Sequence, residues 1–175
     1  ATKEKDVEVF VKRSESELGP IDVAIYNVSG FTKKSIFELT GNDIEEAWRR
    51  TCLGAFYFGK NVAVKMQQRK KGTIIFTGAT AGKRGGKNFG AFAIGKFGLR
   101  ALSQSMAREL NPEGIHTVYV NIDGIVKGSI KEDSNEKDDA FLNPKEIAET
   151  YLHLHRQHKS AWTQEIDLRP WLESF

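Results

Sequence analysis

Lys96 is the residue in this sequence that is best placed to do chemistry, because of the segments that precede it. It lies in a helix-like run, 90–102, which follows a glycine-rich loop at 82–90. A strand-like apolar run, 73–77, comes before that loop. A strand, a turn of small residues, a loop and a helix with an inward lysine form the active site of many α/β enzymes. The order of these segments predicts that Lys96 faces a functional site.

The elements that would position this lysine alternate along the whole chain. Apolar residues recur at helical spacing in some segments, and shorter apolar runs between them are typical of strands. Helices are expected over 4–18, 43–68 and 91–110, with a fourth starting at 143–146. Strands are expected over 21–26, 73–78, 115–122 and 162–168. Strict alternation predicts a three-layer α/β fold, in which a doubly wound parallel sheet lies between helices.

Three turns follow the predicted strands and are the candidate walls of the site. They lie at 27–30, 78–82 and 123–128. Ligands of parallel sheets bind at the carboxyl ends of the strands, where these turns would meet. A polar run follows at 131–140, and its charged composition predicts a mobile loop.

Composition limits the functions to consider. The 175 residues carry 26 basic and 23 acidic side chains, a balance that does not indicate a nucleic-acid partner. Cys52 is the one cysteine, which excludes an internal disulfide and suits the cytoplasm or another reducing compartment. No apolar run approaches the roughly 20 residues of a membrane span, so no membrane association is expected. His155 and His158 are three residues apart but lack a further ligand, so no metal site is predicted.

Several short segments, in a fixed order, resemble motifs of the short-chain dehydrogenase/reductase family. The family pattern Leu-Gly-x-Ile-Asp-x-Leu-Val-Asn-Asn-Ala-Gly resembles residues 18–29, and its Tyr-x-x-x-Lys motif resembles Phe92-x-x-x-Lys96. The family's strand that ends in a catalytic serine resembles 72–79. Further similar segments are 48–54, 103–110 and 122–126. The resemblance runs from residue 1 to about 168, and the chain is identified by it as a divergent member of the family.

The resemblance implies one Rossmann-like domain over 1–175, equivalent to the C-terminal two-thirds of a family member. No glycine-rich nucleotide-binding turn precedes residue 19, and the chain aligns from near the end of the family's third strand. The N-terminal strands, including the central one, are therefore expected to be missing from this chain. A sheet without its middle strand exposes a long apolar edge. We expect either a longer native protein or another chain that covers this edge.

The resemblance also assigns the site residues, and most of them are replaced. In the family a tyrosine transfers the substrate proton, the following lysine binds the nicotinamide ribose, and a serine and an asparagine assist. Lys96 is retained, whereas Phe92 stands at the tyrosine position, Ala79 at the serine position and Thr51 at the asparagine position. Loss of one general acid costs about 10²–10⁴-fold in rate, so catalytic activity is doubtful.

Two threonines offer substitutes for the missing serine hydroxyl, because Thr77 and Thr80 lie close to Ala79 in sequence. NAD or NADP is the cofactor that the resemblance implies. The residues at the family's cofactor-binding positions are Asn27, Val28, Ser29, Lys96, Asp123, Gly124 and Val126.

Two functional hypotheses remain open from the sequence. The first is an NAD(P)-linked oxidoreductase of small-molecule carbonyls or alcohols, with an altered active site. The second is a non-catalytic family member that acts as a binding or oligomerisation module. The resemblance implies a homo-oligomer that pairs through helices 43–68 and 91–110. The residues that suit close packing there are Phe56, Gly59, Ala63, Phe97, Ala101 and Ser105.

Overall fold

The sheet has four parallel strands in the order in which they occur along the chain. The structure is a computed structural model and describes residues 1–129 and 139–173. In those ranges the sheet order is β1-β2-β3-β4, with every neighbouring pair parallel. The strands are β1 (Val23–Tyr26), β2 (Gly72–Thr77), β3 (Ile115–Ile122) and β4 (Glu165–Leu168). The predicted parallel α/β sheet is confirmed.

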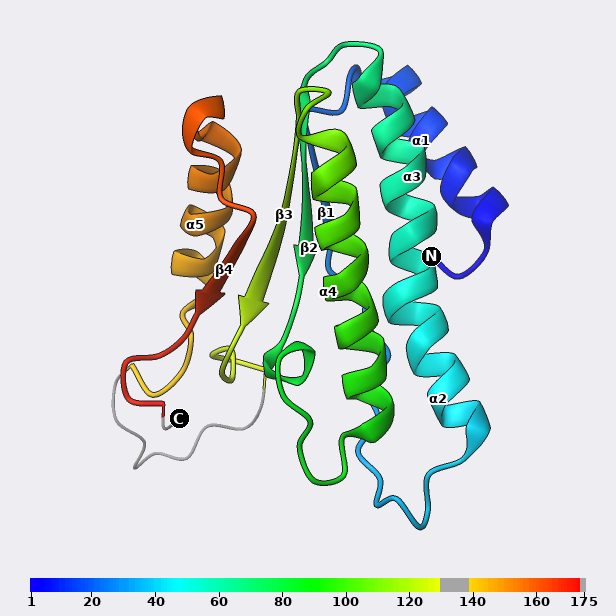
Figure 1. The fold of residues 1–175 in the computed structure, drawn as a ribbon, viewed down its shortest axis with the longest axis vertical. Helices are drawn as coiled ribbons and strands as arrows, with labels where there is room; N and C mark the ends of the chain where they lie inside the picture. The colour runs from blue at the N-terminus through cyan, green and yellow to red at the C-terminus, as the bar shows by residue number, and fades with distance from the viewer. Residues whose placement is uncertain (130–138, 174–175) are drawn as a thin grey trace.

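Helices cover both faces of this sheet and make three layers (Figure 1). The helices are α1 (Glu4–Leu18), α2 (Gly41–Trp48), α3 (Gly54–Gln67), α4 (Gly90–Leu110) and α5 (Pro144–Arg156). One face carries α1, α2, α3 and α4, and the other carries α5. Within the described ranges no helix is long and apolar enough to cross a bilayer.

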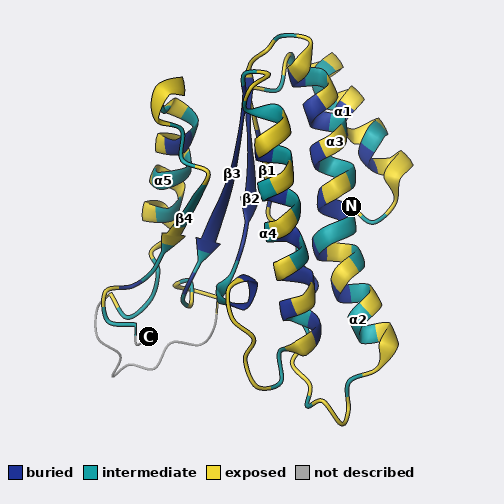
Figure 2. Cartoon of the chain, viewed as in Figure 1, coloured by how far each residue is buried: buried dark blue, intermediate teal, exposed yellow. Residues whose placement is uncertain are grey.

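The core divides into two clusters because successive side chains of a strand point to opposite faces. On β2, Ile74 and Phe76 join the cluster that α1, α3 and α4 cover. Ile75 faces the other way and packs in the cluster beneath α5. All six residues of β2 are buried, as are the first seven of β3, and both strands are dark blue in Figure 2. Burial on both faces is typical of strands in a parallel sheet that helices cover on both sides.

The predicted helix over 43–68 is interrupted, and this is a correction. A five-residue π-helix, Arg49–Leu53, separates α2 from α3. Two groups from the segment around β1, one side chain and one backbone N–H, form hydrogen bonds with it there. The Tyr26 hydroxyl donates to the Arg50 carbonyl oxygen, and the Thr51 hydroxyl accepts a hydrogen bond from the buried Gly30 N–H at 2.9 Å. Such π-segments occur mostly as single turns inside α-helices. Tyr26 and Gly30, which form these two hydrogen bonds, lie 24 and 21 residues before their partners in the π-helix.

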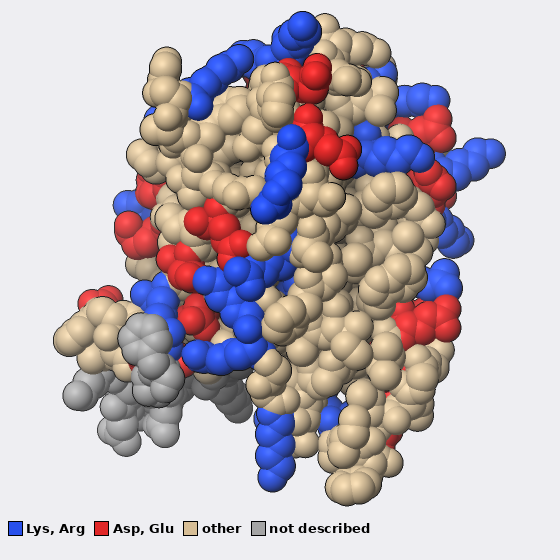
Figure 3. Space-filling model, in the orientation of Figure 1, with Lys and Arg blue, Asp and Glu red and all other residues tan. Residues whose placement is uncertain are grey.

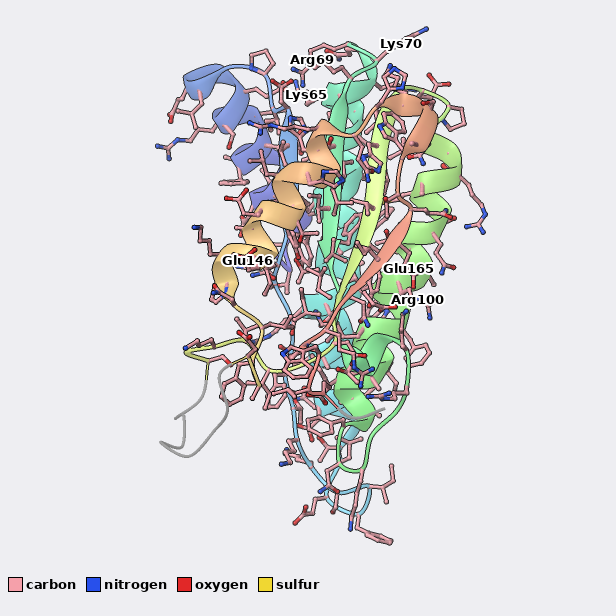
Figure 4. The ribbon with its side chains drawn as sticks, turned by 90° about the vertical axis from the view of Figure 1, so that its left-hand side faces the viewer. Lys65, Arg69, Lys70, Arg100, Glu146 and Glu165 are labelled. Carbon is pink, nitrogen blue, oxygen red and sulfur yellow. The ribbon has the colours of Figure 1, made fainter. Side chains whose placement is uncertain are left out.

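The last strand is shorter than the predicted 162–168, because its first residues are used differently. Trp162 stacks on His116 with ring centroids 4.7 Å apart, and its indole N–H donates to the Gln157 carbonyl oxygen. The strand β4 is then joined to α4 by an ion pair of 2.8 Å between Arg100 and Glu165, which Figure 4 labels.

Basic side chains at the C-terminal end of α3 anchor α1 and the turn before β1. Arg69 donates to the Ile21 carbonyl oxygen at 2.8 Å and lies 3.6 Å from Glu15. Lys65 also approaches Glu15, at 3.7 Å. Figure 4 shows Lys65 and Arg69 at the same end of the molecule. The contacts with Glu15 and Ile21 give Lys65 and Arg69 a structural role.

The strand β1 forms an edge of the described sheet and leaves apolar side chains in contact with solvent. Val23 is 37% exposed and Ile25 is 46% exposed. Ala24 and Tyr26, on the other face of this strand, are buried. Most of the polar run 131–140, for which a mobile loop is predicted, lies outside the described residues.

Candidate functional site

A cavity of about 890 Å³ opens where the strands β1, β2 and β3 end. Its volume falls within the range of small-molecule sites, about 300–1,000 Å³. All three predicted turns contribute to its wall. Their lining residues include Asn27, Ser29, Gly78, Ala79, Thr80, Ala81, Gly124 and Val126. The structure therefore brings together turns that are separated by about a hundred residues of sequence.

Lys96 lies in this cavity wall and is itself only 4% exposed. Its Nζ donates a hydrogen bond of 2.8 Å to the Thr77 carbonyl oxygen at the end of β2. Burial lowers the pKa of Lys96 to about 8, because an apolar environment disfavours the charged ammonium. Among the described residues it is the one buried lysine, and it forms none of the ion pairs found there.

Phe92 contributes an aromatic surface at the position for which the sequence resemblance predicts a replaced tyrosine. Its ring lies 5.3 Å from that of Phe31 and 6.4 Å from that of Phe89, centroid to centroid. Lys96 Nζ lies 5.8 Å from the centroid of the Phe92 ring. This aromatic wall, Phe31, Phe89 and Phe92, offers cation–π attraction and apolar contact but no exchangeable proton.

The two threonines near Ala79 both direct their hydroxyls at other protein groups. The Thr80 hydroxyl donates to Asp123 Oδ1 at 2.6 Å. The Thr77 hydroxyl lies 2.9 Å from the Tyr151 hydroxyl, in a hydrogen bond that either group can donate. Because the Thr80 proton is engaged by Asp123, this hydroxyl is available to a ligand as an acceptor only.

Tyr151 is a site residue that the sequence analysis missed. It projects from α5 into the cavity wall, on the face of the sheet opposite α4. Burial raises the pKa of its phenol, and the hydrogen bond to Thr77 acts in the opposite direction. The sequence identifies Tyr151 only as one apolar position of a helix, and no local spacing relates it to Lys96.

Asp123 holds the chain together beside the cavity. It is 8% exposed and is not among the residues that line the cavity. One oxygen accepts from Thr80, and Arg169 Nη1 donates to the other at 2.9 Å. Arg84 lies 3.8 Å away on the far side of the loop after β2. The Asp123 carboxylate therefore joins the turns after β2, β3 and β4. The cofactor contact predicted for Asp123 stays a prediction.

Thr51 and Val28, two more predicted positions, also lie outside the cavity lining. Thr51 is completely buried and its hydroxyl bonds to the Gly30 N–H, which fixes the turn after β1. Cys52 beside it has its thiol pKa raised by burial, so it is a poor nucleophile.

The turn after β2 sits directly on a buried aromatic ring. A Cβ at Gly78 would overlap Cζ and Oη of Tyr119, and one at Gly82 would also meet Oη. The Gly78 N–H donates to the Val120 carbonyl oxygen at 2.7 Å, so the backbone there is fixed from β3. Glycine is thus required where the chain leaves β2 and enters the cavity wall.

The family model for short chain dehydrogenases matches residues 1–139. The chain belongs to the short-chain dehydrogenase/reductase family. The chain is 30% identical over 153 residues to a short-chain dehydrogenase/reductase of Armillaria gallica, covering 86% of this chain and 57% of that protein. It is 31% identical over 117 residues to the 3-ketodihydrosphingosine reductase of Mus musculus, covering 66% of this chain and 34% of that enzyme.

Solved structures of similar proteins have the same fold. A crystal structure of a short-chain dehydrogenase from Rhodopseudomonas palustris has a TM-score of 0.81 at 36% identity, over 97% of this chain and 71% of that one. An alcohol dehydrogenase from Thermococcus sibiricus, complexed with 5-hydroxy-NADP, has a TM-score of 0.85 at 23% identity, over 99% and 73%. This short-chain dehydrogenase/reductase chain spans little more than half the length of the Armillaria protein.

Proposed function

We propose that this chain forms the nicotinamide side of an NAD(P) site in an oxidoreductase-like protein whose proton-transfer groups are replaced. The observation that carries the proposal is Lys96, a buried lysine in a cavity at the carboxyl ends of the parallel strands. Burying an unpaired cation is costly, which favours a functional reason for its presence. Family membership supports the assignment of that reason to a dinucleotide.

The residues around Lys96 fit a nicotinamide riboside. An ammonium has three N–H donors, and the Thr77 carbonyl oxygen accepts one of them. The remaining donors suit the two hydroxyls of a ribose. Asn27 and Ser29 on one side, and Gly124 and Val126 on the other, line the same cavity and would flank the ring. A bound dinucleotide would supply hydride transfer, while this chain's residues would bind and orient it.

Proton transfer is the part of the family reaction that these residues do not support. Phe92 and Ala79 carry no hydroxyl, and Thr80 donates its proton to Asp123. Turnover of a small-molecule carbonyl or alcohol is therefore expected to be weak. Among the described residues that line the cavity, Tyr151 is the one that carries a phenol. Burial raises the pKa of this phenol, which makes it a weak acid.

Calorimetric titration of the full-length protein with NADH and NADPH tests this proposal. We expect saturable binding of one of them, and at least a tenfold weaker association after Lys96→Met, because the ribose hydroxyls lose their donor. Lys87→Met, which removes an exposed lysine, is the matched control and should bind as the wild type does. Failure of both dinucleotides to bind the wild-type protein would refute the proposal.

An assembly role is the second candidate, and an exposed apolar surface favours it. Phe56 of α3 and Phe97 of α4 are 41% and 43% exposed, and Ala101 and Ser105 of α4 are exposed as well. Figure 3 shows a broad area over α3 and α4 with few charged side chains. Gly59 and Ala63 were also expected at this interface, and the structure corrects this: both are buried, and a Cβ at Gly59 would meet Met106 and Phe76.

The partner that we propose for this surface is a second copy of the chain. Sedimentation velocity should detect a dimer of the wild-type protein at micromolar concentration. The double variant Phe56→Lys/Phe97→Lys should be monomeric, because it places two cations in the apolar interface. Phe10→Lys on α1, where the side chain is 61% exposed, should leave the dimer intact. A monomeric wild type would contradict this role.

A further inference from the structure

The amine of Lys96 is held where a neutral ligand can reach it and where water is scarce. Its side chain is 4% exposed, yet it forms part of the wall of a cavity that can hold a small molecule. One hydrogen bond, to the Thr77 carbonyl oxygen, fixes its position. Other described lysines, such as Lys34 and Lys60, are exposed and pair with carboxylates. Lys96 alone among them is both buried and directed at a cavity.

Apolar side chains line much of the cavity around this amine. The aromatic wall, Phe31, Phe89 and Phe92, lies on one side. Aliphatic side chains complete much of the remainder: Ile25, Ile122, Ile125, Val126 and Ile147. Besides Lys96, the ionisable side chains of the lining are Arg84, Tyr151 and Glu173.

We propose that Lys96 Nζ forms an imine with apolar aldehydes that enter this cavity. The inference goes beyond dinucleotide binding and does not depend on it. It rests on a primary amine buried at an apolar cavity, which is the setting in which lysines act as nucleophiles toward carbonyl compounds. The ring at position 92 is apolar and would lie against the organic part of such a ligand.

The reaction balances with water as the only other participant. Lys96 first loses a proton to water. The nitrogen lone pair then attacks the aldehyde carbon, an N–C bond forms, and the carbonyl π electrons move to oxygen. Water carries one proton from the nitrogen to this oxygen, which gives a neutral carbinolamine. A proton from water then converts the hydroxyl into a departing water molecule, the nitrogen lone pair forms the C=N bond, and the last N–H proton returns to water. The imine is hydrolysed by the reverse steps, so the capture is reversible.

A substantial fraction of Lys96 is in the neutral, nucleophilic form at mildly alkaline pH. Burial lowers its pKa to about 8, so roughly half of the amine is neutral at pH 8. An exposed lysine with a pKa of about 10.4 is less than about 1% neutral at that pH. Arg84 opposes protonation of the amine by its positive charge and Glu173 favours it, and both line the same cavity.

Reductive trapping tests the proposal directly. The protein is incubated at pH 8 with 3-phenylpropanal and sodium cyanoborohydride, which reduces an imine to a stable secondary amine, and labelled lysines are mapped by peptide mass spectrometry. We expect at least tenfold more label on Lys96 than on Lys33 or Lys87, two exposed lysines in loops that border the aromatic wall. Lys96→Met should lose only this label.

A polar aldehyde separates a cavity effect from general amine reactivity. Glycolaldehyde gains nothing from the apolar wall, so the preference for Lys96 over Lys87 should fall at least fivefold. Equal labelling of Lys96 and Lys87 by 3-phenylpropanal, in protein whose circular dichroism shows it folded, would overturn the proposal. Dinucleotide binding is measured separately by calorimetry, so a failure of the labelling leaves the proposed cofactor site to be judged on its own test.

Discussion

Lys96→Met is expected to raise the free energy of unfolding by about 2 kcal/mol at pH 7. The lysine pKa falls from 10.5 to about 8 on folding, and a shift of this size corresponds to about 3 kcal/mol of destabilisation while the amine is charged in both states. Methionine has a similar unbranched shape and no charge to desolvate. The variant also loses the hydrogen bond to the Thr77 carbonyl oxygen, and this loss offsets about 1 kcal/mol of the gain in stability.

The pH dependence identifies the cause of that stabilisation. Below pH 8 both the folded and the unfolded protein carry the proton, so the destabilisation by Lys96 is fully present. Between pH 8 and 10.5 the unfolded chain still binds the proton and the folded protein does not, so wild-type stability rises with pH. The difference between wild type and Lys96→Met should therefore fall by about 2 kcal/mol from pH 7 to pH 10. Tyr26 and Tyr119, whose pKa values burial raises to about 12, are present in both proteins and cancel.

Urea unfolding followed by circular dichroism at pH 7, 8.5 and 10 measures both quantities. Lys87→Met is the matched control, because this lysine is exposed and its replacement should change stability by less than about 0.5 kcal/mol. A Lys96→Met protein that is less stable than the wild type at pH 7 would show that Lys96 supports the fold rather than the site.

Gly78→Ala is expected to destabilise the protein by about 3 kcal/mol, at the upper end of what overpacking a core costs. The new methyl group would overlap the ring of Tyr119, which is fully buried. The backbone of Gly78 is held in place by its hydrogen bond to Val120, so it cannot retreat. The turn that positions Ala79 and Thr80 would be displaced with it.

Thermal and urea unfolding of Gly78→Ala measures this loss. Gly85→Ala is the matched control in the following loop, where a Cβ meets nothing within 4 Å, and its stability should equal that of the wild type. If Gly78→Ala unfolds at the wild-type urea concentration, the close approach of this turn to Tyr119 does not constrain the site.

The parts of the fold that depend on local pattern are predictable from the sequence. The β3 strand matches its predicted bounds, and α4 starts one residue earlier than predicted, because apolar periodicity and flanking turns define both. Helical periodicity continues through the π-helix at Arg49–Leu53, whose bonds from Tyr26 and Gly30 come from another part of the chain. The shortened β4 likewise depends on the stacking of Trp162 on His116, a contact between segments far apart.

The candidate site divides in the same way. Lys96 and the three turns are predicted from their positions after strands, and the structure places them around one cavity. Tyr151 could not be found, because its contact with Thr77 spans 74 residues of sequence. The engagement of Thr80 by Asp123 is equally non-local, and it changes what a hydroxyl near Ala79 can do.

Together these contacts describe a cavity that keeps a costly buried amine and places the ring of Phe92 beside it. The expected stability gain of Lys96→Met and the expected loss of binding by the same variant are the two sides of this account.

Calorimetric titration of NADH and NADPH into the full-length wild-type protein and the Lys96→Met variant is the most direct test of the central claim. The account predicts saturable binding of one dinucleotide to the wild type, and at least tenfold weaker binding to a Lys96→Met protein that is itself more stable. Equal affinity of the two proteins, or no binding of either dinucleotide by the wild type, would contradict it.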